Sequence, residues 1–429
     1  MASRGNGGYP VGCAGGRFRG VYARHRLDLS VADIAFGVLA CARPGRGEGI
    51  EPEILRLCSL EDDGLVCFSV RSGWDLWLAA LGLRPGDEVL VSAVTHPDMV
   101  RIIRGHGLRV VPVDVEPEML APRPEALEAA LTLRTRVVLV AHLFGGLMDL
   151  SPVARFAREH GLLLVEDCAQ AFQGPDRMGH PAADVSMYSF GTLKTSTALG
   201  GAVLRVRDRE MLRRMRALRT GYPVQRRSEY AGKLVKVLCL IAFSLPWPYG
   251  GLAWACARLG ADLDALLNGV VRAFPPGEPV EVLLRRLRRR PSTPLLAVLA
   301  RRLRTFDGAR LARRAAVGER VARGLGSTVD HPGGRSLRRT HWLFPVVAAE
   351  PEILVRRLRL YGLDASRATS SIAAVEAPAG RRAPVAASRM MSGVVFLPVY
   401  PELPGRVLDR MVGIVNEPGV REAKEPVHS

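Results

Sequence analysis

The chain has 429 residues and a formal net charge of +18, from 60 lysine and arginine residues against 42 aspartate and glutamate residues. This charge would suit nucleic acid, an anionic membrane, an anionic substrate, or simply an arginine-biased coding sequence. The arginine runs lack the interleaved aromatic residues of a single-strand binder, so we do not expect nucleic acid as a partner. The seven cysteines are odd in number and have no CxxC spacing, which favours a reducing cytosol over a disulfide framework.

Residues 1–20 are rich in glycine and arginine, and we expect a mobile N-terminus there. It does not resemble a secretory signal, because no apolar core follows directly. Apolar runs separated by helical patterns then predict a mostly parallel sheet flanked by helices, which is an α/β fold. The expected strands contain residues 89–91, 110–115, 137–141 and 162–165. Residues 74–81 have the apolar spacing of a helix.

The expected strand at 162–165 ends in two acids, Glu166 and Asp167, at the point where a buried parallel strand opens into a cleft. A carboxylate there can keep a pyridine ring protonated and so make it an electron sink, while a nearby lysine forms a Schiff base; this is pyridoxal phosphate chemistry. Taken alone, Asp167 is equally well interpreted as the cap of a helix at 168–171.

Lys194 follows in the segment Ser189 to Lys194, ahead of the glycine pair Gly200 and Gly201. The chain has only three other lysines: Lys233, Lys236 and Lys424. A lysine taken at random is a solvated surface residue, but a chain that uses arginine for nearly every positive charge has kept an amine here. Because a guanidinium cannot form a Schiff base, Lys194 together with Asp167 favours the catalytic interpretation.

Val237 to Ala257 contains no charged residue and is about long enough to span a bilayer as one helix. Two prolines and two glycines in its middle break it into two short pieces, which favours a re-entrant or interfacial hairpin. Trp247, Tyr249 and Trp254 suit the lipid headgroup level. The alternative is a buried helix pair over the active site or a dimer interface. Arginine runs that could meet anionic lipid lie at 285–290, 301–304 and 313–314.

Seven stretches, in the same order and at similar spacing, resemble the DegT/DnrJ/EryC1/StrS family of sugar aminotransferases, which have the fold-type-I architecture. The resemblance covers residues from about 72 to 219 and resumes more weakly from about 290 to 415. The stretches are Ser72-Gly73, Arg84 to Val89, Pro112 to Val115, Ala141 to Gly145, Glu166 to Ala171, Tyr188 to Lys194 and Phe396 to Pro401.

This resemblance implies pyridoxal phosphate as cofactor, bound covalently by Lys194, which would also shuttle protons. It implies that Asp167 pairs with the pyridine nitrogen, that Gln170 reaches the phenolic oxygen and that Ser189 binds the phosphate. The relatives that remove a hydroxyl group instead of transferring an amine have histidine in place of the lysine. Lys194 therefore favours transamination over dehydration.

Three positions depart from the family pattern. Trp74 stands where the family has threonine, so we expect a phosphate site of backbone N–H groups at Ser72, Gly73 and Trp74, where a helix begins. His96 stands where the family has a ring-covering aromatic, and it is interpreted either as stacking on the pyridine or as a surface-loop residue. Arg288 would replace an asparagine that a second subunit contributes to the phosphate, which implies a homodimer with a shared site.

We therefore expect a cytoplasmic aminotransferase that moves an amino group, from glutamate, to a keto-sugar or related carbonyl compound. A lipid-linked acceptor at the inner face of the membrane is a further expectation. The alternatives are a non-catalytic regulatory or membrane-associated protein on this fold, and a basic binding module with a vestigial site. The expected divisions are a large cofactor domain at 21–220, an apolar and arginine-rich insertion at 221–304, a smaller α+β domain at 305–420 and a tail at 421–429.

Overall fold

The computed structural model describes residues 20–43, 45, 47–271, 277–367 and 372–417. The expected mobile segment at 1–20, apart from Gly20, and the expected tail at 421–429 lie outside the described residues.

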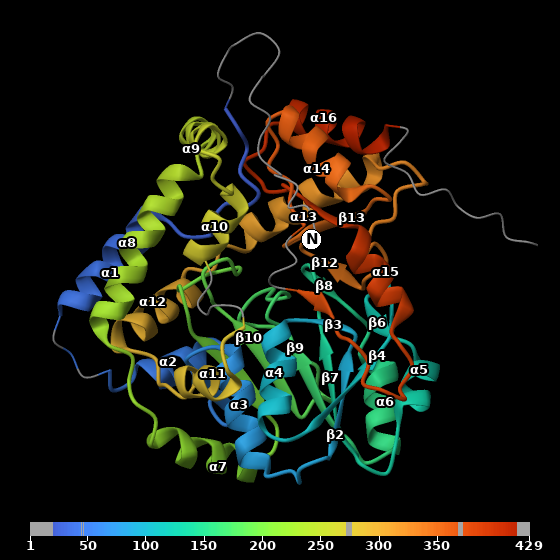
Figure 1. Cartoon of the computed structure of the whole chain (residues 1–429). Coiled ribbons are helices and arrows are strands. Elements are labelled where there is room, and N and C mark those ends of the chain that lie inside the picture. The colour runs from blue at the N-terminus through green and yellow to red at the C-terminus, as the bar shows by residue number, and fades with distance from the viewer. Residues whose placement is uncertain (1–19, 44, 46, 272–276, 368–371, 418–429) are drawn as a thin grey trace, which may run out of the picture.

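A seven-stranded sheet forms the centre of the lower part of the molecule (Figure 1). Its strand order is β1-β11-β10-β9-β7-β2-β4. The five strands from β10 to β4 are parallel to their neighbours, whereas β11 runs antiparallel to both β1 and β10. The expected runs 89–91 and 137–141 lie wholly in strands of this sheet. The run 110–115 continues beyond β4 into the separate strand β5 (Val115–Glu116), and the run 162–165 begins one residue before β9. The strands are β1 (Gly64–Cys67), β2 (Glu88–Ser92), β4 (Arg109–Val113), β7 (Thr135–Ala141), β9 (Leu163–Asp167), β10 (Val185–Ser189) and β11 (Ala202–Val206).

Helices cover both faces of the sheet, because alternate residues of each strand point to opposite faces. Val137 and Leu139 of β7 pack in a core cluster with α3 (Val70–Leu81), α4 (Pro97–Gly105), α7 (Arg209–Thr220) and α11 (Val280–Leu287). Val138 and Val140 of the same strand pack instead with α5 (Pro124–Ala130) and α6 (Ser151–Glu159). Within the first cluster the buried rings of Trp74 and Trp77 stack, with centroids 5.4 Å apart.

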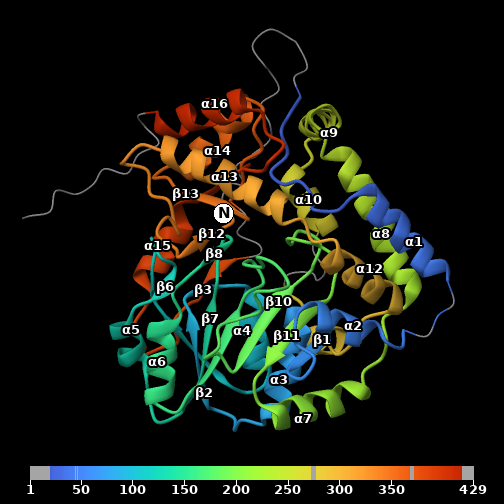
Figure 2. The same ribbon diagram turned by 180° about the vertical axis from the view of Figure 1, so that it is seen from behind.

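A group of helices lies beside the sheet, and Figure 2 shows α8 running next to α1 in it. The helices are α1 (Val31–Ala42), α2 (Ile50–Leu57), α8 (Arg227–Phe243), α9 (Pro246–Arg258), α10 (Leu263–Val271) and α12 (Thr293–Arg304). Leu295 and Leu299 of α12 and Tyr230 and Leu234 of α8 are fully buried in the core that they share with α1 and α2. The uncharged segment Val237–Ala257 is thus two helices with a break at Ser244 and Leu245.

In the part of the chain that the structure describes, no single helix is long and apolar enough to cross a membrane. The pair α8 and α9 passes the same length and composition test only together, with a bend of 95° between them.

The C-terminal part forms a core of its own around β13, β15, α13, α14 and α16. Two short pairings join this part to the sheet domain: β12 with β8 (Gly146–Leu147), and β14 with β3 (Val94–Thr95). The hairpin β5 (Val115–Glu116) and β6 (Ala121–Pro122) follows β4. The C-terminal elements are α13 (Gly308–Gly324), β12 (Arg338–Arg339), β13 (Phe344–Val347), α14 (Pro351–Leu360), β14 (Ala373–Ala374), α15 (Val385–Gly393), β15 (Val394–Leu397) and α16 (Gly405–Asn416).

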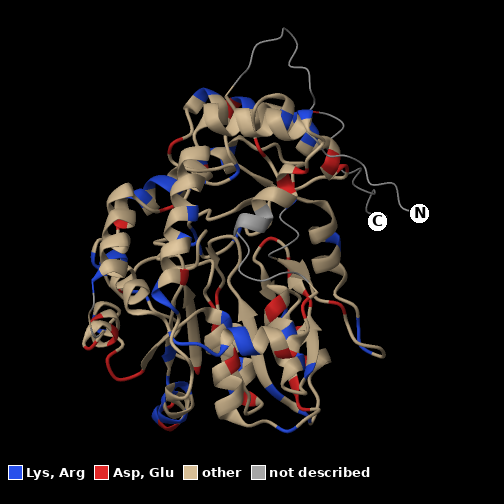
Figure 3. Cartoon of the chain, turned by 60° about the vertical axis from the view of Figure 1, so that its left-hand side comes forward, with Lys and Arg blue, Asp and Glu red and all other residues tan. Residues whose placement is uncertain are grey.

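Basic and acidic residues are interspersed over both the upper and the lower part of the ribbon (Figure 3). Much of the expected arginine run is paired within the chain, which differs from the expectation that these residues face lipid. Arg301 and Arg302 bind the buried carboxylate of Asp33 at 2.9 and 3.0 Å, and Arg289 binds Glu229 at 2.9 Å. The positive charge of this region therefore serves in part to join α12 to α1, and the segment after α11 to α8.

Candidate active site

Asp167 and Ser189 come together at the carboxyl edge of the sheet, because each is the last residue of one of two neighbouring parallel strands. Ligands of open parallel sheets bind at this edge. After Ser189 the chain makes a turn in which the backbone N–H of Lys194 donates to the carbonyl of Gly191 at 2.9 Å. The turn places Lys194 beside the same edge.

The amine of Lys194 is enclosed but has no direct counter-ion among the described residues. Its Nζ atom lies 4.2 Å from the centre of the Trp342 ring. Burial lowers the pKa of Lys194 from 10.5 to about 8; the charge of Asp167 acts in the opposite direction, and the nearby guanidinium of Arg71 lowers it further. Near neutral pH a much larger fraction of this amine is uncharged than for an exposed lysine.

Asp167 is buried, and burial raises the pKa of its carboxyl group. The N–H of Ala169, which donates to Oδ1 at 2.9 Å, and the charge of Lys194 act against this rise. Residues 168–171 form a turn and no helix, so the interpretation of Asp167 as a helix cap is wrong. Its carboxylate caps a turn, and its role at a pyridine nitrogen stays a prediction.

Gln170 directly follows Ala169 in this turn, and its side chain is hydrogen-bonded to a neighbouring loop. Its Oε1 atom accepts a hydrogen bond from the backbone N–H of Phe144 at 2.8 Å. With the carbonyl oxygen occupied, the NH₂ group is the part of this amide that can donate to a phenolic oxygen. The predicted contact of Gln170 with the ring is compatible with this arrangement.

The phosphate site expected at the backbone N–H groups of Ser72, Gly73 and Trp74 differs from the structure, because the N–H groups of Ser72 and Gly73 already donate to Ser69. Helix α3 begins at Val70, and the hydroxyl of Ser69 caps it by accepting from the N–H of Ser72 at 3.1 Å. The N–H of Gly73 is used inside the helix, where it donates to the carbonyl of Ser69 at 3.0 Å. The backbone donors of the first turn are therefore those of Val70 and Arg71, next to Ser69.

The glycine and the tryptophan of that motif serve packing. A Cβ atom at Gly73 would lie 2.6 Å from Leu204 on β11, so a glycine is needed where α3 crosses the sheet. Trp74 is fully buried, and its indole N–H donates to the carbonyl of Met99 at 3.3 Å. Its side chain therefore belongs to the core between α3 and α4.

His96 precedes α4 and caps it, with Nδ1 accepting from the N–H of Asp98 at 3.1 Å. Its side chain is 37% exposed. Asp98 also binds Arg71 at 2.6 Å and Arg101 at 2.8 Å, so His96 lies in the same group of side chains as the first turn of α3. Stacking of His96 on a cofactor ring stays a prediction.

Arg288 has a partner in its own chain. Its Nε atom lies 3.0 Å from Oδ2 of Asp75, a residue of α3 whose side chain is fully buried. His106 contacts the other oxygen of Asp75 at 2.9 Å. These partners, together, lower the pKa of Asp75 against the effect of burial. Arg288 thus joins the end of α11 to α3, and its contact with a phosphate across a subunit interface stays a prediction.

Four side chains that the sequence did not single out surround Lys194: Arg71, Trp342, Arg314 and His25. Arg314 donates to the hydroxyl of Thr195 at 2.8 Å and to the carbonyl of Thr340 at 3.2 Å. Burial lowers its pKa to about 10. His25 stacks on Trp342 with centroids 6.3 Å apart, and burial lowers its pKa to about 4. Arg71 directly precedes the Ser72-Gly73 stretch. No local motif marks the other three residues, since they come from the N-terminal segment and the C-terminal part.

A buried pair, His142 and Glu166, lies behind Asp167. Because Nδ1 of His142 accepts from the N–H of Met148 at 3.2 Å, its Nε2 carries the proton and donates to Glu166 at 3.2 Å. Glu166 also accepts from the hydroxyl of Ser186. His142, Glu166 and Cys168 lie close enough together to hold a metal ion. However, burial raises the pKa of the Cys168 thiol well above its usual range, and the Glu166 carboxylate is already hydrogen-bonded to His142 and Ser186. We therefore assign no metal to this group.

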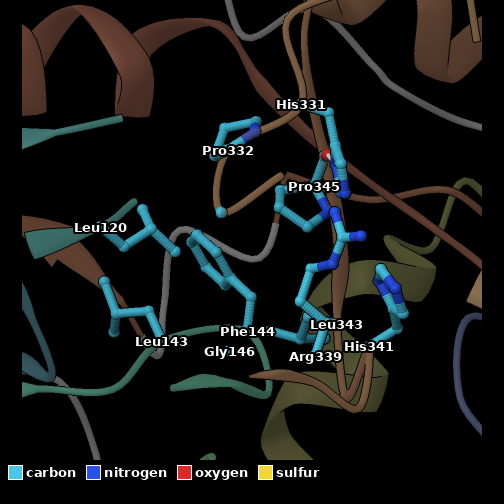
Figure 4. Close-up of a pocket in the computed structure, with 11 residues that line it drawn as sticks. Leu120, Leu143, Phe144, Gly146, His331, Pro332, Arg339, His341, Leu343 and Pro345 are labelled. Atoms are coloured by element: carbon cyan, nitrogen blue, oxygen red, sulfur yellow. Dashed lines mark hydrogen bonds between the residues drawn. The ribbon is translucent and has the colours of Figure 1, made fainter. Parts of the chain in front are cut away.

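A small pocket lies on the C-terminal side of the Phe144 loop (Figure 4). Its lining includes Phe144, Leu343, Arg339 and the imidazoles of His331 and His341. The rings of His331 and Phe344 stack with centroids 4.4 Å apart. The pocket contains none of the residues that surround Lys194, and the candidate site is the carboxyl edge of the sheet.

Residues 61–238 match the DegT/DnrJ/EryC1/StrS aminotransferase family model. This segment belongs to that family. It contains Asp167, Ser189 and Lys194, and also the first turn of α3. The fold-type-I architecture predicted for the chain is confirmed by solved structures that cover nearly all of it. The aminotransferase TlmJ from Streptoalloteichus hindustanus covers 92% of this chain and 98% of its own length with a TM-score of 0.65 and 22% identity. Helicobacter pylori PseC, an aminotransferase of pseudaminic acid biosynthesis, gives a TM-score of 0.66 at 12% identity over 92% and 98%.

Curated relatives match the family segment more closely. The L-glutamine:2-deoxy-scyllo-inosose aminotransferase of Streptomyces fradiae is 39% identical over 160 residues, which are 35% of this chain and 36% of that protein. The UDP-N-acetyl-3-dehydro-alpha-D-glucosamine 3-aminotransferase of Acidithiobacillus ferrooxidans is 33% identical over 41% of this chain and 48% of its own length. A pleiotropic regulatory protein of Geobacillus stearothermophilus is 32% identical over 36% and 43%. The chain thus spans about a third to a half of the curated relatives that it matches.

Proposed function

We propose that this protein is a pyridoxal phosphate-dependent aminotransferase that moves an amino group onto a keto-sugar. The observation that carries the proposal is the amine of Lys194. It is enclosed against Trp342, has a lowered pKa and has no ion pair among the described residues. Burial of an amine without a counter-ion is costly, and a cofactor that carries an aldehyde condenses with such an amine.

The donor set at the sheet edge fits this cofactor. Asp167 would hold the proton at the pyridine nitrogen, Gln170 would donate to the phenolic oxygen, and Ser189 with the first turn of α3 would hold the phosphate. The cofactor, when bound, supplies the electron sink. The chain supplies Lys194, whose pKa of about 8 lets it accept a proton from the substrate carbon and return it near neutral pH.

Arg314 supplies a cation for the amino donor. Its guanidinium is bonded to a hydroxyl and a carbonyl, and it makes no ion pair with a carboxylate of the described residues. It is joined to Lys194 through the neighbouring Thr195. An amino acid donor has a carboxylate that suits a bidentate arginine contact, which supports an amino acid as the donor. We expect glutamate, and the name of the Streptomyces fradiae relative adds glutamine as a candidate.

The keto-sugar acceptor is supported by the names of the relatives, which act on an inosose and on a UDP-linked dehydro-sugar. The regulatory name of the Geobacillus relative favours a non-catalytic role as the second candidate. A regulatory protein would have no need of an enclosed amine beside a buried carboxylate, and we favour the enzyme for that reason.

We also propose that the outer surface of α8 and α9 contacts an anionic membrane. Trp247 and Trp254 lie on one side of α9 with 63% and 54% of their surface exposed. From residue 230 to residue 261 the chain has no acidic residue. Lys236 is exposed on α8, and the guanidinium of Arg258 lies 5.6 Å from the Trp254 ring. Exposed indoles next to cations suit a lipid headgroup layer.

The expected homodimer stays a prediction, which a mass measurement in solution tests.

The decisive experiment separates the two half-reactions. Purified protein with pyridoxal phosphate should change its visible absorption when glutamate or glutamine is added, and a UDP-linked keto-sugar should reverse the change. A Lys194→Ala variant should give neither change at a comparable rate. If no amino acid alters the spectrum of a cofactor-loaded protein, the aminotransferase proposal is wrong.

A further inference from the structure

Lys233 extends from helix α8 back to the carboxyl edge of the sheet. Its Nζ atom lies 3.3 Å from the carbonyl oxygen of Leu199 and 5.5 Å from the centre of the Phe68 ring. Phe68 directly precedes Ser69, the cap of α3, and Leu199 belongs to the segment that leads from Lys194 into β11. The two segments are themselves joined, because the N–H of Gly201 donates to the carbonyl of Phe68 at 3.0 Å. A residue of the insertion therefore lies beside the first turn of α3.

The charge of Lys233 is not neutralised by a carboxylate among the described residues. Glu229, one turn earlier on α8, binds Arg289 at 2.9 Å. Asp98, in the first turn of α4, binds Arg71 and Arg101. Burial lowers the pKa of Lys233; Glu229 opposes this effect, while Arg289 and Arg71 add to it. Lys233 is thus a half-buried cation among other cations, whose hydrogen bond is to a carbonyl oxygen.

The backbone near Lys233 is shaped for close approach. A Cβ atom at Gly200 would lie 3.7 Å from Nζ of Lys233 and 2.9 Å from Leu295 of α12. Gly200 and Gly201 have φ angles of +158° and +84°, which side chains rarely adopt. The glycine pair therefore lets α8, α12 and the Lys194 segment come together at this place.

Arg71 connects Lys233 with the candidate site, because its charge lowers the pKa of both Lys194 and Lys233. Arg71 is in the first turn of α3, and Lys233 lies beside that turn through its contact with Phe68. The N–H groups of Val70 and Arg71 add to the positive field there. Arg71 is already paired with Asp98 at 2.6 Å. Lys233 has no ion pair among the described residues, and a bound dianion would stabilise its charge.

We propose that Lys233 binds a phosphate group at the first turn of α3, from within the same chain. It would take the place that the family resemblance gives to a residue of a second subunit. The phosphate belongs either to the cofactor or to a nucleotide-linked sugar, and the inference rests on the proposed function for that choice. The competing interpretation is that Lys233 has a structural role only, in which its hydrogen bond to the Leu199 carbonyl holds α8 against the segment that follows Lys194.

The test compares Lys233→Gln with a matched control, Lys236→Gln, which removes an exposed lysine three residues later on the same helix. A third variant, Lys233→Arg, keeps the charge. Binding of inorganic phosphate is measured for each protein from the shift of its unfolding temperature with phosphate concentration. Dissociation constants are then measured for pyridoxal phosphate, for pyridoxal without its phosphate, and for UDP on the cofactor-loaded protein.

We expect Lys233→Gln to weaken inorganic phosphate binding at least about tenfold, since a charge-assisted hydrogen bond is lost, while pyridoxal binds as before. Lys236→Gln should change neither, and Lys233→Arg should restore most of the loss. A weakened pyridoxal phosphate constant assigns Lys233 to the cofactor phosphate, and a weakened UDP constant assigns it to the substrate.

Unchanged phosphate binding in Lys233→Gln would overturn the proposal, as would an equal loss for pyridoxal and pyridoxal phosphate. The phosphate measurement needs no turnover. If the protein binds phosphate through Lys233 but transfers no amino group, the proposed function fails while this inference stands.

Discussion

The Nζ atom of Lys194 lies 4.2 Å from the centre of the Trp342 ring. The indole N–H of Trp342 donates to the carbonyl of Leu193 at 2.8 Å, so the ring is fixed to the backbone next to the lysine. The C-terminal part of the chain in this way covers one side of the lysine, which is half-buried. Its low pKa depends on a residue that comes far later in the sequence.

The first prediction concerns pH. Because the uncharged amine attacks the cofactor aldehyde, the rate of cofactor attachment should rise with pH and level off above the Lys194 pKa of about 8. A Trp342→Ala variant should shift the midpoint upward, towards the ordinary lysine value of 10.5, because water reaches the amine. Stopped-flow absorbance from pH 6 to pH 10 measures both curves. Identical midpoints in the two proteins would contradict the role of Trp342.

The second prediction locates the covalent link. Borohydride reduction of the cofactor-loaded protein, followed by peptide mapping, should place the pyridoxyl group on Lys194. Lys233 and Lys236 are the internal controls, because Lys233 also has a pKa lowered by burial. An adduct on either of them would refute the assignment of Lys194.

The third prediction concerns Asp167→Asn. The amide still fits the turn and can accept from Ala169, so we expect a folded protein that binds the cofactor. It cannot hold a proton at the pyridine nitrogen by charge, and kcat should fall by a factor of about a hundred or more. Steady-state kinetics measure this loss, with cofactor occupancy checked by absorbance. A rate near that of the unaltered protein would show that Asp167 only stabilises the turn.

A fourth prediction concerns the pair of Arg288 and Asp75. Arg288→Ala removes the bidentate partner of a fully buried carboxylate and should lower the free energy of unfolding by about 2 kcal/mol, since His106 remains as a partner. Arg285→Ala, at an exposed position on the same helix, should change it by less than about 0.5 kcal/mol. Urea unfolding measures both, and equal effects would show that the ion pair adds nothing.

The fifth prediction tests the surface of α8 and α9. Binding to vesicles with anionic lipid should weaken with salt, because charge interactions are screened over about 10 Å at 0.1 M. Replacing Trp247 and Trp254 with serine should weaken binding further at high salt and leave the cofactor spectrum unchanged, because both rings point outward. If the unaltered protein does not bind anionic vesicles at low salt, the membrane proposal fails. Loss of cofactor in the double variant would instead indicate a packing role.

The parallel strands could be predicted because each is buried on both faces and therefore reads as a short apolar run. The acid at the end of β9 and the lysine after β10 could be predicted too, since a strand end fixes the edge of the sheet at which a residue lies. Gly73 lies inside α3 and not at its start. The sequence does not distinguish these two cases, because a glycine that lets a helix cross a strand closely has the same local pattern as a glycine at a helix start. The capping serine, Ser69, was the better signal.

Other parts of the site could not be found in the sequence. Trp342, Arg314 and His25 approach Lys194 from remote segments, and nothing in their local sequence records that contact. Arg288 shows the reverse: a residue in a motif-like position is held elsewhere by Asp75, a buried partner that no spacing reveals. The local sequence pattern therefore predicts which edge of the sheet holds Asp167 and Lys194. The residues that contact the lysine from other segments depend on tertiary packing, which the pattern does not record.

The antiparallel pairing of β1 with β11 has a consequence for how the chain folds. Among the described residues, β1 has one sheet neighbour, β11. This pairing closes a long loop, and such non-local contacts form slowly. Until β11 has been synthesised, β10 also has one open edge, with unpaired N–H and C=O groups that invite aggregation. A chain shortened to end before Ala202 would contain Lys194 and Asp167 and still be expected to aggregate.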